Sequence, residues 1–387
     1  MGFLAGRVTF LRFHVNGPRP RGFNEDHLGK LDAHRAGRQR IASADGIEAG
    51  WSGGDHVLDT DFDLAKNIVN DALLFDLRVD TEKAPSDLMR AYTAIELKSL
   101  IKDNPSGFAS ARQKREAREA ARERLEQEGK DGRHTKRKCV PVMWDSKTNE
   151  VLFGATAISH IDRFASLFQQ TFGHGLDMVT AGKRAYRLAE LHEKTRQVDD
   201  ASPSEFVAGI TPNEISWCPD ESSRDFIGNE FLMWLWYHLE VENDTLKLMD
   251  DTDATVMLAR SLTLECPRAV TGSDTIKHEG PTRLPEAKRA LQSGKLPRKA
   301  GLTVVRHSDQ FEFALHAETL AVGAAKLPPV GEDIKEERAR QEERITQIRD
   351  LIETVDLVYD AFGDVRFNSD WSKKTLPALQ KWLMKVS

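Results

Sequence analysis

The most restrictive feature of this sequence is residues 111–128, in which arginine and glutamate alternate over an alanine background. Leu125 is the one large apolar residue of this stretch, so a helix formed here can bury very little apolar surface. The segment before it, residues 88–100, places apolar residues at helical spacing and is followed by the turn sequence DNPSG. Together the two segments predict a helical hairpin over residues 84–138 that protrudes from the body of the protein.

The rest of the chain is expected to contain both strands and helices. Apolar runs bounded by turn residues predict strands at 7–15, 72–80, 140–145, 150–157 and 255–266, and a strand pair within 301–315. Helical spacing and capping residues predict helices near 24–31, 159–172, 225–240, 284–293 and 345–355. This mixture predicts an α+β protein with a two-part core of mixed or antiparallel sheet.

Changes in composition divide the chain into parts. Residues 1–83 and 139–189, on either side of the hairpin, are expected to form the first half of the core, and residues 205–330 the second half. Residues 190–204 are polar and acidic, as expected of a linker. Residues 331–387 are expected to form a C-terminal helical extension, because three isoleucines and a valine recur there at heptad-like spacing.

The charge of this chain is strongly segregated, although its net charge is only −6. Residues 111–138 hold 11 Lys/Arg and 6 Asp/Glu, and residues 277–300 hold 7 and 2, so each stretch carries +5. Residues 190–265 hold 5 Lys/Arg and 17 Asp/Glu, which gives −12. Such segregation indicates one surface for a polyanion and another that repels it.

Cysteine usage and hydropathy favour a protein of the reducing cytoplasm. The cysteines Cys139, Cys218 and Cys266 are far apart and match no disulfide or metal-site spacing. Arg7 and Arg12 interrupt the first apolar run, unlike in a signal peptide. The longest apolar run, FLMWLWY, is too short to cross a bilayer. We therefore expect a cytoplasmic protein without a membrane partner.

Basic residues of the two positive stretches are the candidate contacts to a polyanion. Lysine and arginine neutralise phosphates without regard to base sequence, and release of counterions makes the affinity fall steeply with salt. On a helical wheel, the arginines of 111–128 form a stripe beside a stripe of glutamates. The candidates are Arg112, Arg115, Arg118, Arg122, Arg133, Lys136, Arg137, Lys138, Lys288, Arg289, Arg298 and Lys299.

The order of the elements resembles the RdgC family of recombination-associated proteins. The likeness covers residues 70–175, and a weaker one over 255–325 consists of a basic cluster, a helix, a Gly-Lys step and a strand pair. The motifs that carry it are Glu82-Lys83-Ala84-Pro85 at the entry to a long helix, the charged helix 111–128, the Trp144-Asp145 hairpin, and a helix that ends at Phe172-Gly173.

This resemblance implies an RdgC-like homodimer closed into a ring, whose basic central hole encircles double-stranded DNA without sequence preference. It further implies a nucleoid-associated protein that modulates homologous recombination by competing with RecA, with neither an enzymatic activity nor a cofactor. Lys277 and His278 look like the basic cluster of the family near the hole, and the basic residues of 111–138 would line or approach it.

Two other functions stay open at this point. Asp87, Glu96 and Lys98 resemble the acidic constellation with which many nucleases hold a divalent metal, although they fall in a helical rather than a strand pattern. A metal-dependent nuclease that acts on DNA is therefore the first alternative. The second is a protein–protein adaptor that uses the charged helix and the heptad-like C-terminal helix to bind another chain.

Overall fold

The computed structural model describes residues 2–37, 46–82, 85–102, 108–129, 134–156, 160–210, 215–218, 220–268, 271–331 and 334–385. The strands of the first half of the sheet are β1 (Val8–Asn16), β2 (Ile47–Ser52), β3 (Ile68–Val69), β4 (Ala72–Glu82), β5 (Thr135–Asp145), β6 (Glu150–Phe153) and β7 (Gly175–Met178). Those of the second half are β8 (Thr245–Lys247), β9 (Asp253–Glu265), β10 (Ser273–His278), β11 (Leu296–Arg306), β12 (Asp309–His316) and β13 (Val322–Lys326).

Within these described ranges the strands join in one 13-stranded sheet, in the order β10-β9-β11-β12-β13-β1-β6-β5-β4-β2. The remaining strands β3, β7 and β8 pair with β4, β1 and β9. Neighbouring strands are antiparallel, and β1 joins the halves because it pairs with β6 along one edge and with β13 and β7 along the other. The expected α+β class is confirmed, with a large antiparallel sheet that runs through both halves.

The helices account for most of the remaining described residues. They are α1 (Glu25–Ala33), α2 (Leu64–Asn67), α3 (Ser86–Ile101), α4 (Ala111–Gly129), α5 (Ile161–Phe172), α6 (Ala181–Leu191), α7 (Thr195–Asp199), α8 (Ile227–Val241), α9 (Pro285–Gln292), α10 (Glu337–Arg366) and α11 (Leu376–Met384). The segment 190–204, expected as a linker, contains the end of α6 and the whole of α7, and its Val198 is fully buried.

Two hydrophobic cores lie on the sheet. The smaller one forms where α5 packs on the first half, because Phe164, Phe168 and Phe172 recur on one helix face, as their spacing predicts. They pack around Trp144, whose ring centroid is 5.2 Å from that of Phe168. Trp51 contributes to the same core and donates a 2.7 Å hydrogen bond from Nε1 to Thr171 Oγ1.

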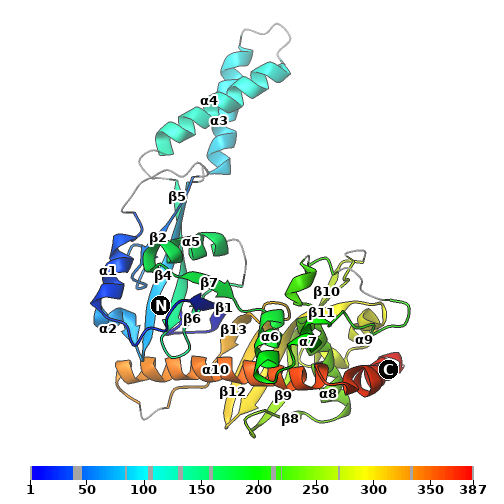
Figure 1. Ribbon diagram of the computed structural model, residues 1–387. Coiled ribbons are helices and arrows are strands. Elements are labelled where there is room, and N and C mark those ends of the chain that lie inside the picture. The colour runs from blue at the N-terminus through cyan, green and yellow to red at the C-terminus, as the bar shows by residue number, and fades with distance from the viewer. Residues whose placement is uncertain are drawn as a thin grey trace.

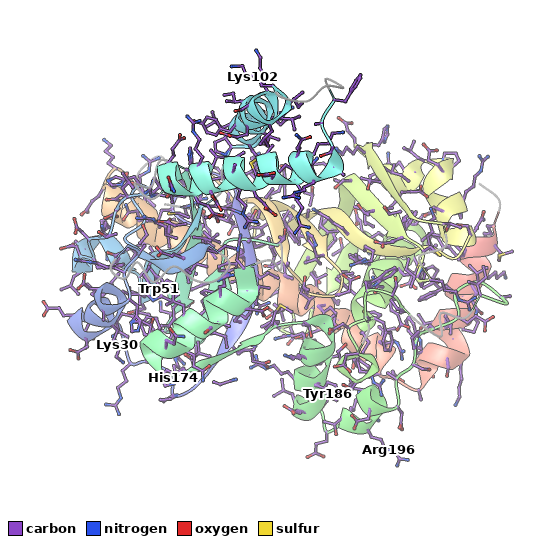
Figure 2. The ribbon with its side chains drawn as sticks, turned by 90° about the horizontal axis from the view of Figure 1, so that it is seen from above. Lys30, Trp51, Lys102, His174, Tyr186 and Arg196 are labelled. Carbon is purple, nitrogen blue, oxygen red and sulfur yellow. The ribbon has the colours of Figure 1, made fainter. Side chains whose placement is uncertain are left out.

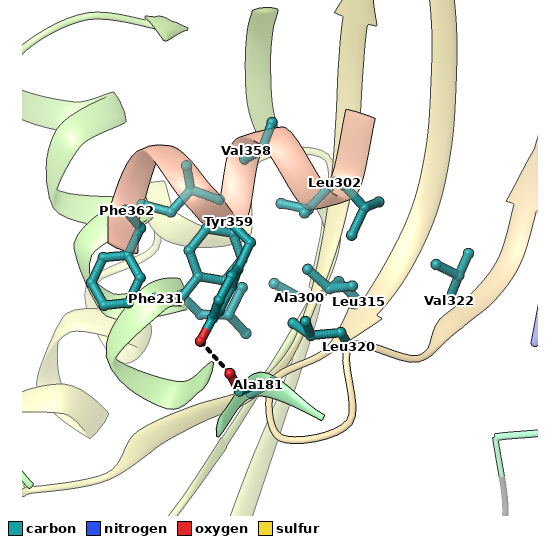
Figure 3. Close-up of a cluster of buried hydrophobic side chains, with 14 of the residues drawn as sticks. Ala181, Phe231, Ala300, Leu302, Leu315, Leu320, Val322, Val358, Tyr359 and Phe362 are labelled. Atoms are coloured by element: carbon teal, nitrogen blue, oxygen red, sulfur yellow. Dashed lines mark hydrogen bonds between the residues drawn. The ribbon is translucent and has the colours of Figure 1, made fainter. Parts of the chain in front are cut away.

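The larger core fills the space between the second half of the sheet and helices α6, α8 and α10 (Figure 3). Helix α8 is buried from Ile227 to Tyr237, because nearly all its side chains are apolar. Tyr359 of α10 packs against Phe231 of α8 and donates a 2.7 Å hydrogen bond to the Ala181 carbonyl. Tyr359 thus links α10 to α6 by the hydrogen bond and to α8 by the ring contact.

Helix α10, which belongs to the C-terminal extension, runs beneath both halves of the sheet (Figure 1). At its N-terminal end Arg344 donates to the Phe3 carbonyl at 2.7 Å, and Arg349 pairs with Asp145 of β5 at 2.8 Å. At its C-terminal end Arg366 pairs with Glu230 of α8 at 2.5 Å. The extension therefore braces the two halves.

The predicted helical hairpin is present and projects from the sheet (Figure 1). The long paired strands β4 and β5 lead into it, and α3 packs against α4. Ala117, Ala121 and Leu125, four residues apart, are the buried positions of α4. Across the contact, Tyr92 of α3 donates to Glu128 at 2.9 Å.

Candidate nucleic-acid interface

The second half of the sheet has one face that is free of the larger core. Alternate side chains of β9, β11 and β12, such as Leu258, Leu302 and Phe313, enter the core with α8 and α9, so the intervening side chains point the other way. We call this second surface the open face. Its side chains are Thr255, Met257, Ser261, Thr263, Thr275, Lys277, Lys299, Thr303, Val305, Glu312, Ala314, His316 and Lys326.

Small and hydroxyl-bearing side chains make the middle of the open face shallow. Gly301, Ala314 and Gly323 are paired directly across β11, β12 and β13. Gly301 is required here, because a Cβ atom at this position would lie 2.1 Å from the Ala259 carbonyl oxygen. Such a surface lets a broad ligand come close to the backbone, while serine and threonine hydroxyls can donate to phosphate.

Lys277 and Lys299 extend the open face with positive charge. Lys277 of β10 stands opposite Ser261, and Lys299 of β11 stands between Thr263 and His316. Burial, followed by the positive charges of Lys299 and Arg298, lowers the pKa of His316 from 6.5 to about 4. The two cations therefore act on this imidazole in the same direction as its burial.

Sequence reasoning did not find two further cations of the open face, Arg260 and Lys326. Both form ion pairs with Glu312, and Lys326 Nζ lies 3.6 Å from Glu312 Oε1. Lys326 lies on β13, a strand too short to be predicted. Arg260 falls within a predicted strand, but regular alternation would direct it to the same face as Leu258 and Leu262, and a bulge changes its direction.

The basic residues at the base of the hairpin point to both faces of β5. Lys136 and Lys138 are exposed and stand opposite Thr81 and Val79 of β4, on the face that α5 covers further down. Arg137 points to the other face, where its Nε lies 3.7 Å from Asp80 Oδ2. Arg133, which was expected to belong to this cluster, lies outside the described residues.

His160 lies immediately before α5 and close to Lys138. Burial is the largest cause that lowers the pKa of His160, and the positive charges of Lys138 and Arg163 lower it in the same direction. Lysine at 138 is therefore close enough to the start of α5 to act on its first residues. The hairpin base is thus a second positive site, separate from the open face.

The arginines of α4 are exposed, as expected for a helix with so little apolar surface. Arg115 and Arg122 form i,i+4 ion pairs with Glu119 and Glu126, at 3.1 and 2.9 Å. Such exposed pairs contribute only about 0.3–0.5 kcal/mol to helix stability, so they do not commit these arginines to one partner. Arg112 and Arg118 are also exposed.

The remaining candidates are on the side of the larger core or at its margin. Lys288 and Arg289 lie on α9, and the Lys288 ammonium lies over the Trp382 ring at 5.4 Å. Arg298 stacks on Trp217 and pairs with Glu265 and Glu318. His278, the last residue of β10, pairs in register with Arg260, and its Nδ1 accepts a 3.1 Å hydrogen bond from the Gly280 N–H. The structure thus splits the 277–300 stretch between two faces of the sheet.

The acidic stretch, residues 190–265, is divided between the larger core and the sheet. Its helices α7 and α8 contribute to the larger core, whereas its strand β9 belongs to the sheet itself. Figure 2 draws Tyr186 of α6 and Arg196 of α7 at the edge of the molecule opposite to Lys102 of the hairpin. In this view α7, at the start of the acidic stretch, therefore lies away from the hairpin.

The residues of the nuclease alternative do not form a metal site. Asp87 and Glu96 lie on the same helix α3, more than two turns apart, and Asp87 is exposed and paired with Arg90. Among the described residues, no group of three or more histidine, cysteine, aspartate and glutamate side chains has the geometry to hold a metal ion. The constellation that the sequence indicated is thus dispersed along the helix.

Comparisons with known proteins assign no family to the chain. No model of a known protein family matches it, and a search of curated proteins finds no match. Within the described ranges, no helix has both the length and the apolar character needed to cross a membrane.

Proposed function

We propose that this protein binds double-stranded DNA without sequence preference and that the open face is its principal contact surface. The observation that carries the proposal is the chemistry of this face. Lysines and an arginine surround a strip of small and hydroxyl-bearing side chains, on a face of the sheet that the helices of the larger core leave uncovered. Such a surface attracts a polyanion.

The flat surface of the open face favours contact to phosphates over contact to base edges. The open face is a sheet surface, and neither a helix nor a two-stranded ribbon projects from it to enter a major groove in the described part of the chain. Its lysines are mobile point charges that accept any backbone register. Binding without sequence preference follows from these properties.

The hairpin supplies a second, more distant set of cations. The α4 arginines and Lys136 and Lys138 stand away from the sheet, where they can reach DNA that lies on the open face of the same or another subunit. Leu88 and Ile95 of α3 and Phe108 beyond it are apolar and exposed, by 37%, 54% and 81%. These side chains favour a protein contact at the hairpin, and we propose a homodimer that closes around the duplex.

Fluorescence anisotropy with labelled duplexes of unrelated sequence tests the proposal. We expect similar affinities for all duplexes and an affinity that falls steeply with salt concentration. The double variant Lys277→Glu/Lys299→Glu should bind at least tenfold more weakly, because each reversal places a like charge against phosphate. The control Arg289→Glu alters one charge on the other face and should bind like the wild type.

The proposed consequence in the cell is interference with homologous recombination. A protein that occupies duplex DNA without sequence preference hinders the access of RecA to the same duplex, so strand exchange should slow as the protein is added. Analytical ultracentrifugation tests the dimer. A protein that stays monomeric with and without DNA would overturn the ring, and a lack of any salt-dependent duplex binding would overturn the proposed function.

A further inference from the structure

Three side chains from three strands meet on the open face, and we call them the Glu312 cluster: Arg260 of β9, Glu312 of β12 and Lys326 of β13. Glu312 and Lys326 are directly opposed in the register of β12 and β13. Lys326 Nζ lies 3.6 Å from Oε1 of Glu312, and the Arg260 guanidinium pairs with Oε2. Gln310 also donates to Oε1, at 3.1 Å. One carboxylate therefore serves two cations.

The cluster has its carboxylate at the bottom and its cations at the top. The side chain of Glu312 is only 11% exposed, whereas those of Arg260 and Lys326 are 55% and 60% exposed. A ligand that approaches the open face meets positive charge first. The net charge of the cluster, +1, leaves part of that charge without neutralisation.

A local distortion of the backbone directs Arg260 into this cluster. Leu258 pairs with Leu302 and Leu262 with Ala300, so three residues of β9 stand opposite the single Gly301. Arg260 has a φ of 68°, in the left-handed region that a residue with a side chain adopts only at an energetic cost.

Strand β11 lies between Arg260 on β9 and Glu312 on β12, so the Arg260 side chain has to cross β11 to reach the carboxylate. The residue of β11 that faces the bulge is Gly301, which has no side chain to stand between the two. A Cβ atom at Gly301 would lie 2.1 Å from the Ala259 carbonyl oxygen, so only glycine permits this backbone. The glycine at 301 and the left-handed backbone of Arg260 together place the arginine side chain at the middle of the open face.

We infer that Arg260 and Lys326 are phosphate-binding residues of the open face and that Glu312 holds them in position while it weakens their grip on DNA. The inference rests on the proposed function. The guanidinium of Arg260 can donate two parallel hydrogen bonds to a phosphodiester, and Lys326 adds a mobile charge.

The exposed head groups of Arg260 and Lys326 can gain a second partner without leaving Glu312. Because both cations are more than half exposed, a phosphate can approach them from the solvent side while the carboxylate stays beneath. Glu312 then stays close to the phosphate and repels it. The cluster is therefore a regulated part of the DNA surface, in which the carboxylate sets the affinity and limits retention on the duplex.

The substitution Glu312→Gln tests the inference, since it removes the charge and keeps the shape of the side chain. We expect a several-fold higher affinity for duplex DNA and a slope of log K against log salt that is steeper by about 0.9 for each cluster that contacts DNA. Arg260→Gln and Lys326→Gln should each lower the affinity and make the slope shallower by a similar amount.

Matched controls exist on α9, which lies on the other side of the sheet. Glu286→Gln and Arg289→Gln change the same charges on exposed residues and should leave both affinity and slope unchanged. Circular dichroism and thermal unfolding confirm that each variant is folded. Arg260→Lys keeps the charge without the guanidinium fork and should bind with intermediate affinity.

The results separate this inference from the proposed function. If the wild type binds duplex DNA in a salt-dependent manner but Glu312→Gln behaves like Glu286→Gln, the inference is wrong and the proposed function stands. The same conclusion follows if Arg260→Gln and Lys326→Gln both bind like Arg289→Gln. If the wild type does not bind duplex DNA at low salt, both are overturned.

Discussion

At the scale of single residues, the structure contains ionisable groups whose environment opposes their charged form. Burial is the main cause that lowers the pKa of His14 from 6.5 to about 4, and it acts in the same way on His316. Asp76 shows the opposite sign, because burial raises its pKa from 3.8 to about 6. At neutral pH the histidines are neutral in both the folded and the unfolded state, so their protonation does not oppose folding there.

This pKa shift predicts a loss of stability in mild acid. The unfolded chain protonates His14 and His316 near pH 6.5 and the folded chain only near pH 4, so their contribution to the free energy of unfolding is complete above pH 6.5 and is lost as the pH falls toward 4. Urea titrations across this interval measure it. His316→Gln should make the decline shallower than in the wild type, and a change of the exposed His56 to Gln should not.

Comparison with a variant is necessary because Asp76 acts in the opposite direction over part of the interval. Its contribution to stability grows as the pH falls from about 6 toward 3.8. The difference between wild type and His316→Gln removes this common effect. Identical pH dependence in the two proteins would show that the imidazole of His316 is not held in its neutral form by the fold.

At the scale of elements, the hairpin is the least supported part of the described chain. Helix α3 has no buried residue, and α4 buries Ala117, Ala121 and Leu125 only. The Arg124 guanidinium lies over the Tyr92 ring, 4.2 Å from its centroid, which adds one contact between the helices. Local opening of the hairpin therefore requires much less free energy than unfolding of the sheet.

Leu125→Ala should loosen the hairpin without affecting the body. Removal of this side chain should lower the stability of the helix pair by about 2 kcal/mol, which corresponds to roughly 30-fold faster amide exchange in α3 and α4. Exchange in β4 and β5 should stay unchanged. Hydrogen exchange with mass spectrometry measures both regions, and Glu123→Ala, on the exposed side of α4, is the control. Equal acceleration in the hairpin and the sheet would contradict this description.

The local character of these elements explains what the sequence could predict. Helix α4 was expected at 111–128 and extends from Ala111 to Gly129, because the alanine, arginine, glutamate and glutamine that make up this segment all have high helix propensity. The stripe of Phe164, Phe168 and Phe172 predicted α5 through its helical spacing. The short strand β13 has no comparable local signal, since Val322–Lys326 becomes a strand only through its neighbours β12 and β1.

The candidate site was harder to predict than the elements. Alternation along β9 and β11 predicts which residues share a face, so Lys299 could be placed once its strand was known. Arg260 could not, because its direction depends on a bulge whose cause, Gly301, lies on another strand. The basic stretch 277–300 was treated as one surface, although a strand and a helix within it present their charges to opposite faces.

At the scale of the whole molecule, the sheet and α10 couple the two cores. Arg12 of β1 donates to Glu150 of β6 at 3.0 Å and to Asp356 of α10 at 2.6 Å. All three side chains are buried, and Asp356 also pairs with Arg184 at 3.1 Å, so the loss of Arg12 would leave the buried Glu150 without its arginine partner. Strand β1 also contributes Phe10 to the larger core and Phe13 to the smaller one.

This coupling predicts a single unfolding transition. Phe10→Ala should lower the free energy of unfolding by about 3–5 kcal/mol, because the side chain is completely buried. The loss should be equal when it is measured by exchange of the slowest amides in β4 and β5 and in β11 and β12, although Phe10 itself touches only the larger core. A loss confined to β11 and β12 would mean that the two halves unfold independently.

The position of β1 also constrains how the protein can be made. Val8 pairs with Ala325 of β13, so the first strand of the sheet completes its pairing only when the last described strand is present. During synthesis the smaller core can assemble from residues up to Met178, and β7 can pair with residues 13–16 of β1, but the same edge at residues 8–10 stays unpaired until β13 has left the ribosome. An exposed edge invites association with other nascent chains. The central strand thus makes completion of this fold a late event and gives a chaperone a defined interval in which to act.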